Sequence, residues 1–361
     1  MRTAAPSRPA SGTAGPASRG GGMRLDGDMT RRYVIIGAGA IGGGIGALLA
    51  RQGAAVVLVA RGEHLARMRR TGMRLRTPEV DATVPVTAVA GPEEITLGED
   101  DVLVLATKTQ QAEAALAAWA DAPVGERTAG QALPILTALN GAAAEERALR
   151  WFARVIGVCV WMPAVRLQPA EVIVRGAPVG GIFPAARYPA ALTTDEDRSL
   201  IAGIAEDWAP AGLRVHPVED VMPWKHRKLL GNLGNAVQAL LGTGDGDVVR
   251  AAREEAAGIY EAAGIVLNPE AEEQAMRDLL QVRPVPGEPE EMGGSTWQSL
   301  ARGTGDSEVD YLSGEIAALA HRNGRTAPVN AGLARLTRRA ARTGARPGAL
   351  SSAELRAQLG L

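Results

Sequence analysis

The sequence predicts an α/β domain over about residues 30–217, an all-helical domain over 218–345 and a tail at 346–361. Two observations predict the first domain. Short, continuously apolar runs alternate with Ala-rich helical segments, and a Gly-rich turn joins the first run to the first helix. This alternation is typical of a parallel sheet with helices on both faces. Beyond about Glu219, helical periodicity is interrupted only at Gly- and Pro-containing turns, which predicts the second domain.

The strands of the first domain are predicted from runs that are apolar throughout, as burial of both sheet faces requires. Such runs lie at residues 33–36, 55–60 and 102–106, and 133–139 is a further predicted strand, apolar except at Thr137. The segment 73–90 is expected to form short antiparallel strands, and 155–183 is again rich in strand-forming residues.

The helices are predicted from their period and their end signals. A first helix runs to about Gln52 and ends at Gly53, a residue type favoured at helix C-termini. Thr193 and Glu196 predict a capping box that starts a helix running towards Pro210. In the second domain, breaks are expected at 242–246, 268–269, 284–289 and 303–305, and Ser351 with Glu354 predicts another capping box.

Composition excludes several classes of protein. The chain has 361 residues, a net charge of −1 and 46% hydrophobic residues, which fits a globular protein without a nucleic-acid partner. No apolar run reaches the length of a membrane span, and a cytoplasmic location is expected. The single cysteine, Cys159, excludes an internal disulfide, and the four histidines have no metal-ligand spacing, so no metal is expected.

Residues 1–29 are rich in Ala, Gly, Pro, Ser and Arg without periodicity, which predicts a disordered tail. The tail lacks the apolar centre of a secretory signal. Translation could begin at Met1, Met23 or Met29, and a start at Met29 would leave every predicted element in the product.

A nucleotide site is predicted where the first strand meets the first helix. The motif G-x-G-x-x-G occupies Gly37, Ala38, Gly39, Ala40, Ile41 and Gly42. Its glycines allow a tight turn, close approach of a pyrophosphate and close packing of helix on strand. Arg61 follows the second strand, where NAD-binding sites carry an acid, and an arginine there suits the 2′-phosphate of NADP(H). An ordinary exposed arginine is the alternative.

Only three of the 39 basic residues are lysines: Lys108, Lys225 and Lys228. A lysine can release its proton, whereas arginine stays charged at any working pH. Lys228, Asn232 and Asn235 have helical spacing i, i+4 and i+7, which predicts a stripe of one ammonium and two amides on a single helix. A solvated polar face would give the same pattern. Lys225 falls on another face and is interpreted as a surface charge.

With these motifs together, the chain resembles the ketopantoate reductases (2-dehydropantoate 2-reductases) over about residues 33–336. The family pattern has the Gly-rich turn and arginine, a lysine after a later strand, an Asn-Gly pair, R-K-L-x-x-N, a hydroxyl pair and E-I-D-Y. The corresponding residues here are Gly37 to Gly42, Arg61, Lys108, Asn140 with Gly141, Arg227 to Asn232, Ser295 with Thr296, and Glu308 to Tyr311.

The resemblance implies a Rossmann-like NADP-binding domain, an all-α domain, and NADPH-dependent reduction of 2-dehydropantoate to (R)-pantoate in pantothenate biosynthesis. It implies that Lys228 is the general acid, that Asn140 lies near the nicotinamide and that Glu308 holds the lysine or hydroxyl groups of the closed site. It further implies contacts of Lys108, Arg61 and Gln111 with the adenine-ribose phosphate, and contacts of Asn232, Ser295 and Thr296 with the substrate. A homodimer is possible.

Three departures concern the substrate. The family's second helix asparagine corresponds to Ala236, with Asn235 beside it; Thr296 replaces a serine; and Gln298 lies near the position of a frequent aspartate. Two alternatives therefore stay open: an enzyme acting on another small branched 2-oxo or 2-hydroxy acid, and a non-catalytic NADP-binding sensor.

Overall fold

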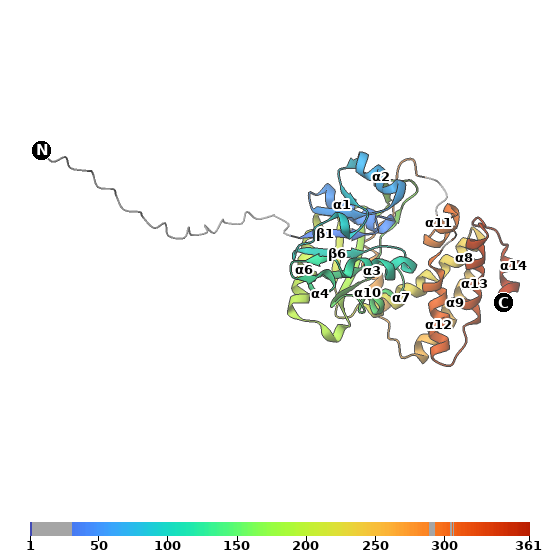
Figure 1. The fold of residues 1–361 in the computed structure, drawn as a ribbon. Helices are drawn as coiled ribbons and strands as arrows, with labels where there is room; N and C mark the ends of the chain where they lie inside the picture. Colours follow the sequence, from blue (N-terminus) through green and yellow to red (C-terminus); the bar gives the residue numbers. More distant parts are fainter. Residues whose placement is uncertain (2–30, 289–292, 304, 306) are drawn as a thin grey trace.

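The computed structural model describes residues 1, 31–288, 293–303, 305 and 307–361. Apart from Met1, the predicted disordered tail lies outside the described residues. The structure has an α/β domain followed by a helical domain, as the sequence predicted, and the two lie side by side (Figure 1).

The first domain is built on an eight-stranded sheet with the order β14-β13-β10-β9-β6-β1-β2-β5. All neighbours pair in parallel except β10 and β13. The strands are β1 (Arg32–Ile36), β2 (Ala55–Val59), β5 (Thr87–Val89), β6 (Asp101–Leu105), β9 (Pro134–Thr137), β10 (Arg154–Val158), β13 (Gly181–Tyr188) and β14 (Leu213–Pro217).

Helices cover both faces of this sheet. Tyr33 and Ile35 of β1 belong to a buried cluster with α1 and α6, whereas Val34 and Ile36 belong to a second cluster with α3, α4 and α5. Successive residues of a strand point to opposite faces, so a continuously apolar strand satisfies both clusters. The helices are α1 (Ala40–Arg51), α2 (Gly62–Thr71), α3 (Ala112–Ala120), α4 (Ala129–Ala132), α5 (Ala144–Ala148) and α6 (Asp195–Trp208).

Beside the main sheet lies a second sheet with the order β11-β12-β3-β4. Its strands are β3 (Met73–Arg76), β4 (Asp81–Val84), β11 (Ala164–Val165) and β12 (Glu171–Val174), and β7 (Pro123–Val124) with β8 (Arg127–Thr128) forms a separate hairpin. The antiparallel pair predicted within 73–90 is β3 with β4. The rest of that prediction is wrong, because β5 joins the main sheet in parallel with β2 and buries Ala88 and Val89 there.

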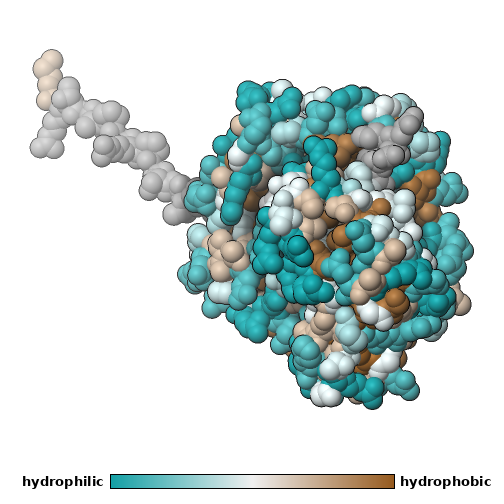
Figure 2. All heavy atoms as spheres, turned by 90° about the vertical axis from the view of Figure 1, so that its right-hand side faces the viewer, coloured by the Kyte–Doolittle hydropathy of each residue, from teal (hydrophilic) through white to brown (hydrophobic). Residues whose placement is uncertain are grey.

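The helical domain packs around a core that includes Leu233, Val237, Ile316 and Leu333, all fully buried. Its helices are α7 (Met222–Asn232), α8 (Gly234–Leu241), α9 (Gly246–Ala262), α10 (Glu270–Arg277), α11 (Ser295–Arg302), α12 (Ser313–Arg322), α13 (Pro328–Arg342) and α14 (Ser352–Leu359). Among the described segments, no helix has the length and apolarity needed to cross a membrane. The face of this domain seen in Figure 2 is mostly hydrophilic, with hydrophobic areas between.

Two of the predicted helix boundaries need correction. The single helix expected through Lys228 and Asn235 is interrupted at Leu233, which ends α7 and precedes α8. The capping box of α6 is formed by Thr194 and Asp197, one residue later than predicted. The capping box of Ser351 and Glu354 is confirmed.

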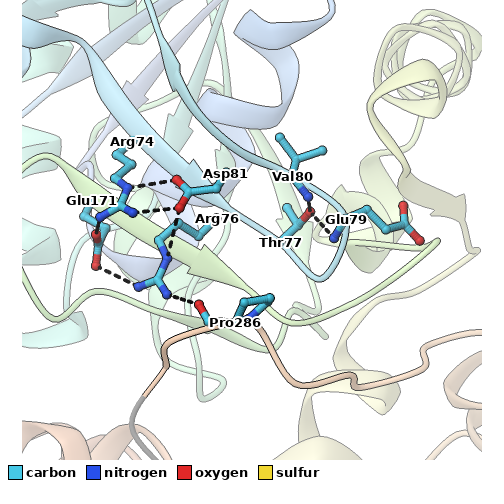
Figure 3. Close-up of polar contacts among 8 residues, drawn as sticks. All are labelled: Arg74, Arg76, Thr77, Glu79, Val80, Asp81, Glu171 and Pro286. Atoms are coloured by element: carbon cyan, nitrogen blue, oxygen red, sulfur yellow. Dashed lines mark hydrogen bonds and ion pairs between the residues drawn. The ribbon is translucent and has the colours of Figure 1, made fainter.

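A segment of the second domain, 280–288, returns to the first domain; we call it the return segment. Val282 forms a bridge with Gly176, and Val285 is buried in a small cluster with β11 and β12. Arg76 donates a hydrogen bond to the Pro286 carbonyl (Figure 3). The chain therefore crosses between the domains more than once.

An ionic network surrounds β3, the strand whose Arg76 contacts the return segment. Figure 3 shows Arg74 and Arg76 of β3 side by side, facing Asp81 and Glu171. Arg74 is 2.7 Å from Asp81 and 2.9 Å from Glu171, and Arg76 is 3.6 Å from Glu171. Arg76 and Glu171 are both largely buried, which ties β3 to β12 beneath the return segment.

Candidate active site

The Gly-rich turn has the shape that a bound pyrophosphate requires. Gly37 has φ +106°, and a Cβ there would lie 2.9 Å from the backbone of Ala106. A Cβ on Gly42 would lie 2.2 Å from the Gly37 carbonyl oxygen, so this residue must be glycine for α1 to pack on the turn. Gly39 is different, because nothing lies within 4 Å of its missing Cβ. Free space at Gly39, directly before Ala40 and Ile41 at the start of α1, leaves room for a phosphate at the helix N-terminus.

His64 supports this turn and was missed by the sequence analysis. Its Nδ1 accepts from the Ala170 backbone N–H at 2.8 Å, so its Nε2 must be the atom that donates to the Ala38 carbonyl at 2.6 Å. Burial lowers the pKa of His64, which favours this neutral tautomer. The spacing of His64 after the motif carried no recognisable signal.

Arg61 lies at the end of β2, immediately before α2, and its side chain is exposed. Its guanidinium makes no hydrogen bond or ion pair within the part of the chain that the structure describes. The side chain of Gln111 is exposed as well, at the end of the short 3₁₀ turn Thr109–Gln111. Both residues are therefore accessible to a ligand on this edge of the sheet.

Glu308 joins the two domains. It lies in the 3₁₀ turn Glu308–Tyr311 of the helical domain and is 5% exposed. Its Oε2 accepts from Lys108 Nζ at 2.5 Å, and its Oε1 accepts from the Thr109 backbone N–H at 3.1 Å and from Thr109 Oγ1 at 3.0 Å. Lys108 thus faces the inter-domain carboxylate, and its predicted contact with the adenine-ribose phosphate stays a prediction.

Lys228 reaches from α7 to the first domain. Its Nζ donates to Asn140 Oδ1 at 2.8 Å and to the Val160 carbonyl oxygen. Because an ammonium has three donors, one N–H is left for another acceptor. Burial lowers the pKa of Lys228, and the nearby Lys225 charge lowers it further, while the carboxylates of Glu308 and Glu273 oppose the shift.

In the Asn-Gly pair, the glycine allows close packing at the interface between the two domains. Gly141 has φ +80°, and a Cβ there would lie 2.7 Å from the Tyr311 carbonyl oxygen, three residues after Glu308. Glycine therefore permits the backbone after Asn140 to meet the Glu308 turn closely. Thr109 Oγ1, which donates to Glu308, also lies 3.4 Å from the Asn140 carbonyl oxygen.

The remaining predicted residues lie on the helical side. Asn232 is the last residue of α7 and is half-buried, whereas Asn235 lies on α8 beyond the interruption. Asn235 Oδ1 is 2.9 Å from the missing Cβ of Gly294, next to Ser295. Thr296 is 2% exposed, and its Oγ1 has no hydrogen-bond partner within the described residues. Among the described residues, no side-chain hydrogen bond joins Asn232, Asn235, Ser295 or Thr296 to Lys228.

The interpretation of Lys225 as a surface charge is wrong. Lys225 is 2% exposed and its Nζ lies 2.5 Å from Glu145 Oε1 in a buried ion pair. Its side chain lies under the loop that carries Asn140, because α7 packs that face against the first domain. The scarcity of lysine and the Glu145-Glu146 pair after Asn-Gly were the only signals in the sequence.

Comparison with known proteins identifies the family. Residues 33–183 match the family "Ketopantoate reductase PanE/ApbA", and residues 220–341 match its C-terminal counterpart. The 2-dehydropantoate 2-reductase of Pyrococcus horikoshii is 26% identical over 313 residues, covering 83% of this chain and 94% of the relative. The enzyme of the same name from Mesorhizobium japonicum is 30% identical over 59% of this chain and 68% of its own length.

Solved structures agree with this result. A PanE/ApbA family ketopantoate reductase from Ralstonia eutropha JMP134 is 25% identical, with a TM-score of 0.69 over 87% of this chain and 99% of that chain. A D-mandelate dehydrogenase in a ternary structure with NADH and anilino(oxo)acetate shares the fold, with a TM-score of 0.71 at 19% identity over 87% of this chain and 99% of that chain. The two family matches together span most of the chain, which therefore belongs to the ketopantoate reductase family of oxidoreductases.

Proposed function

We propose that the protein reduces 2-dehydropantoate to (R)-pantoate with NADPH, and that Lys228 is the general acid. The observation that carries the proposal is the environment of Lys228. Two acceptors from the first domain hold its ammonium, and the third N–H remains for the oxygen of a substrate. The relatives of Pyrococcus horikoshii and Mesorhizobium japonicum, both 2-dehydropantoate 2-reductases by name, support the same reaction.

The residues present fit a nicotinamide dinucleotide. The open space at Gly39 would hold the pyrophosphate at the N-terminus of α1, and the exposed guanidinium of Arg61 would bind the 2′-phosphate. When bound, NADPH supplies the hydride that reduces the keto carbon. Lys108 and Gln111 follow β6, the neighbour of β1 in the sheet, and would also contact the adenine-ribose phosphate.

Lys228 completes the reduction by proton transfer. Its ammonium hydrogen-bonds to the keto oxygen and transfers one proton to it as the carbon is reduced, so that a hydroxyl group forms. Solvent then returns a proton to the lysine amine. A pKa lowered by burial makes this proton easier to release than that of an exposed lysine.

Asn140 and Glu308 fix the geometry of this transfer. Asn140 must turn its amide oxygen towards Lys228, because the ammonium only donates, and its amide NH₂ would then be the group that donates to the nicotinamide or the substrate. Glu308 keeps a negative charge near Lys228 and clamps the two domains through Lys108 and Thr109. Together they keep the lysine charged and oriented.

The carboxylate end of the substrate is bound by the helical domain. Thr296 has a buried hydroxyl without a partner among the described residues, at the first turn of α11, and Ser295 precedes it. A hydroxyl pair at a helix N-terminus suits a carboxylate. Asn232, one turn beyond Lys228, binds the substrate hydroxyl, and Asn235 lines the same side next to Ser295.

The proposal is tested by NADPH oxidation with 2-dehydropantoate, 2-oxoisovalerate and further 2-oxo acids. We expect kcat/KM to be highest for 2-dehydropantoate and the product to be the R enantiomer. A higher kcat/KM for another oxo acid would show that 2-dehydropantoate is not the substrate, while the assignment as a reductase would stand. Nucleotide binding without turnover across the panel would instead indicate a sensor. Lys228→Ala, assayed in parallel, corrects for contaminating reductases.

A further inference from the structure

A buried lysine that the proposed reaction does not use lies directly behind the site. Lys225 Nζ donates to Glu145 Oε1 at 2.5 Å, to the Leu139 carbonyl at 3.2 Å and to the Val158 carbonyl at 3.3 Å. These three acceptors use all three hydrogens of the ammonium. Lys225 is therefore fixed, with no hydrogen left for a ligand.

The contacts of the two lysines run in parallel. Lys225 binds the carbonyl of Leu139, and Lys228 binds the side chain of the next residue, Asn140. Lys225 binds the carbonyl of Val158, and Lys228 binds the carbonyl of Val160, two residues further along the same chain segment. The lysines are separated by one helical turn of α7. One turn of α7 is thus hydrogen-bonded both to the loop that carries Asn140 and to the chain at and after the end of β10. These bonds fix the position of α7 along both segments.

Glu145 anchors the other end of this arrangement. The side chains of Lys225 and Glu145 are 1% and 0% exposed. Glu145 Oε1 also accepts from Thr137 Oγ1 at 2.6 Å, which connects α5 to the end of β9. The loop that carries Asn140 lies between Thr137 and Glu145, so both of its ends are tied to one carboxylate.

A gain in stability does not by itself explain why Lys225 and Glu145 are charged in this buried position. Removing two charges from water is costly, and a well-packed apolar pair in the same position is often as stable or more stable. What an apolar pair cannot reproduce is the directed hydrogen bonding to the carbonyls of Leu139 and Val158.

We propose that Lys225 and Glu145 form a positioning pair that sets the register between Lys228 and Asn140 across the domain interface. This inference rests on the proposed function, because it needs Lys228 as the general acid. The pair touches neither substrate nor cofactor, and it acts through the loop and the helix that carry the reacting groups.

The charge of Lys225 gives the pair a second, measurable effect. The charged or titratable groups acting on Lys228 are Lys225, Cys159, Glu308 and Glu273, and of these only Lys225 carries positive charge. Lys225→Met therefore raises the pKa of Lys228, and Glu145→Gln, which leaves the Lys225 charge uncompensated, lowers it. The fall of kcat at high pH should move in opposite directions in the two variants.

The decisive variant is Lys225→Met/Glu145→Leu, which replaces both charges by apolar groups and so avoids a buried unpaired charge. We expect it to fold and to bind NADPH with a Kd within about twofold of the parent. Its kcat per folded enzyme should fall by about 10–100-fold, the scale of a misplacement near 1 Å. An unchanged kcat together with unshifted pH profiles in the single variants would overturn the proposal.

A matched control is Arg32→Met/Asp101→Leu. This pair, 2.6 Å apart with Asp101 3% exposed, lies at the opposite ends of β1 and β6 from the site. Its removal should change stability without changing kcat per folded enzyme. Lys228→Ala separates the two ideas: if it keeps its activity, the proposed function fails, whereas an inactive Lys228→Ala beside a fully active double variant rejects only the positioning pair.

Discussion

Lys228 uses two of its three hydrogens on Asn140 and Val160, and the third carries the proposed chemistry. Lys228→Ala should lower kcat by about 10²–10⁴-fold, the usual contribution of a general acid. Lys228→Arg should not restore it, because a guanidinium does not release a proton at working pH. Steady-state NADPH oxidation checks both variants, and near-normal turnover by Lys228→Arg would contradict the assignment.

Arg61 is expected to distinguish NADPH from NADH. A charge-assisted hydrogen bond contributes about 1.5–3 kcal/mol, so Arg61→Asp should raise KM for NADPH by about 10–100-fold and change KM for NADH little. Arg70→Asp is the matched control, because Arg70 is exposed near the other end of α2 and the charge change is identical. Equal effects of Arg61→Asp on both dinucleotides would reject the phosphate contact.

The two lysines of α7 also show what sequence reasoning can reach at this scale. The expectation that Lys225 falls on another face of the helix than Lys228 is wrong, because residues three apart are neighbours on a helix and both lysines contact the first domain. The partner of Lys225 is Glu145, 80 residues away in the chain. Lys225 is buried and paired with Glu145 because α7 packs on the loop that carries Asn140, and the sequence does not show this packing.

At the scale of elements, the Asn-Gly loop depends on its glycine. Gly141→Ala adds a Cβ 2.7 Å from the Tyr311 carbonyl at φ +80°, so we expect about 1–3 kcal/mol of destabilisation and a lower kcat. Gly125→Ala is the control, since Gly125 also has positive φ, at +58°, but open space around it. Denaturant unfolding and kcat should show a stability loss in both variants and a loss of kcat only in Gly141→Ala.

The central strands β9, β6, β1 and β2 were predictable because burial on both faces demands apolar runs. The edge strand β14 was not predicted, because its sequence alternates apolar with polar residues and is partly exposed. The interruption between α7 and α8 was not predicted either, because Leu233 is a good helix former within an amphipathic pattern. Gly231 and Gly234 flank it, and each weakens a helix by about 1 kcal/mol relative to Ala. Such a small preference leaves the outcome to packing, which here buries Leu233 completely. Likewise, the pattern of β5 did not reveal which sheet it would join.

For the whole molecule, two half-buried histidines, His64 and His226, predict loss of stability in acid. Burial is the main cause that lowers the pKa of His64 and of His226. Below the unfolded-state pKa of about 6.5, the unfolded chain binds protons that the folded chain does not. The free energy of unfolding should therefore be greatest above pH 6.5 and fall as the pH decreases below it.

Urea unfolding at pH 7.5 and pH 5.5 measures this difference. His64→Gln should reduce the loss between the two pH values, since glutamine does not titrate in this range. An equal loss in the parent and in a His64→Gln/His226→Gln variant would assign the acid sensitivity to carboxylates instead.

Because the return segment packs on the first domain, the chain cannot be cut into two fragments that each keep all their contacts. A cut between β14 and α7 would leave residues 280–288 on the C-terminal fragment, with Val285 deprived of its cluster and Arg76 of the Pro286 carbonyl. The N-terminal fragment would in turn lose the bridge from Gly176, just beyond β12, to Val282. The halves of this chain should thus behave as complementing fragments that need each other to fold.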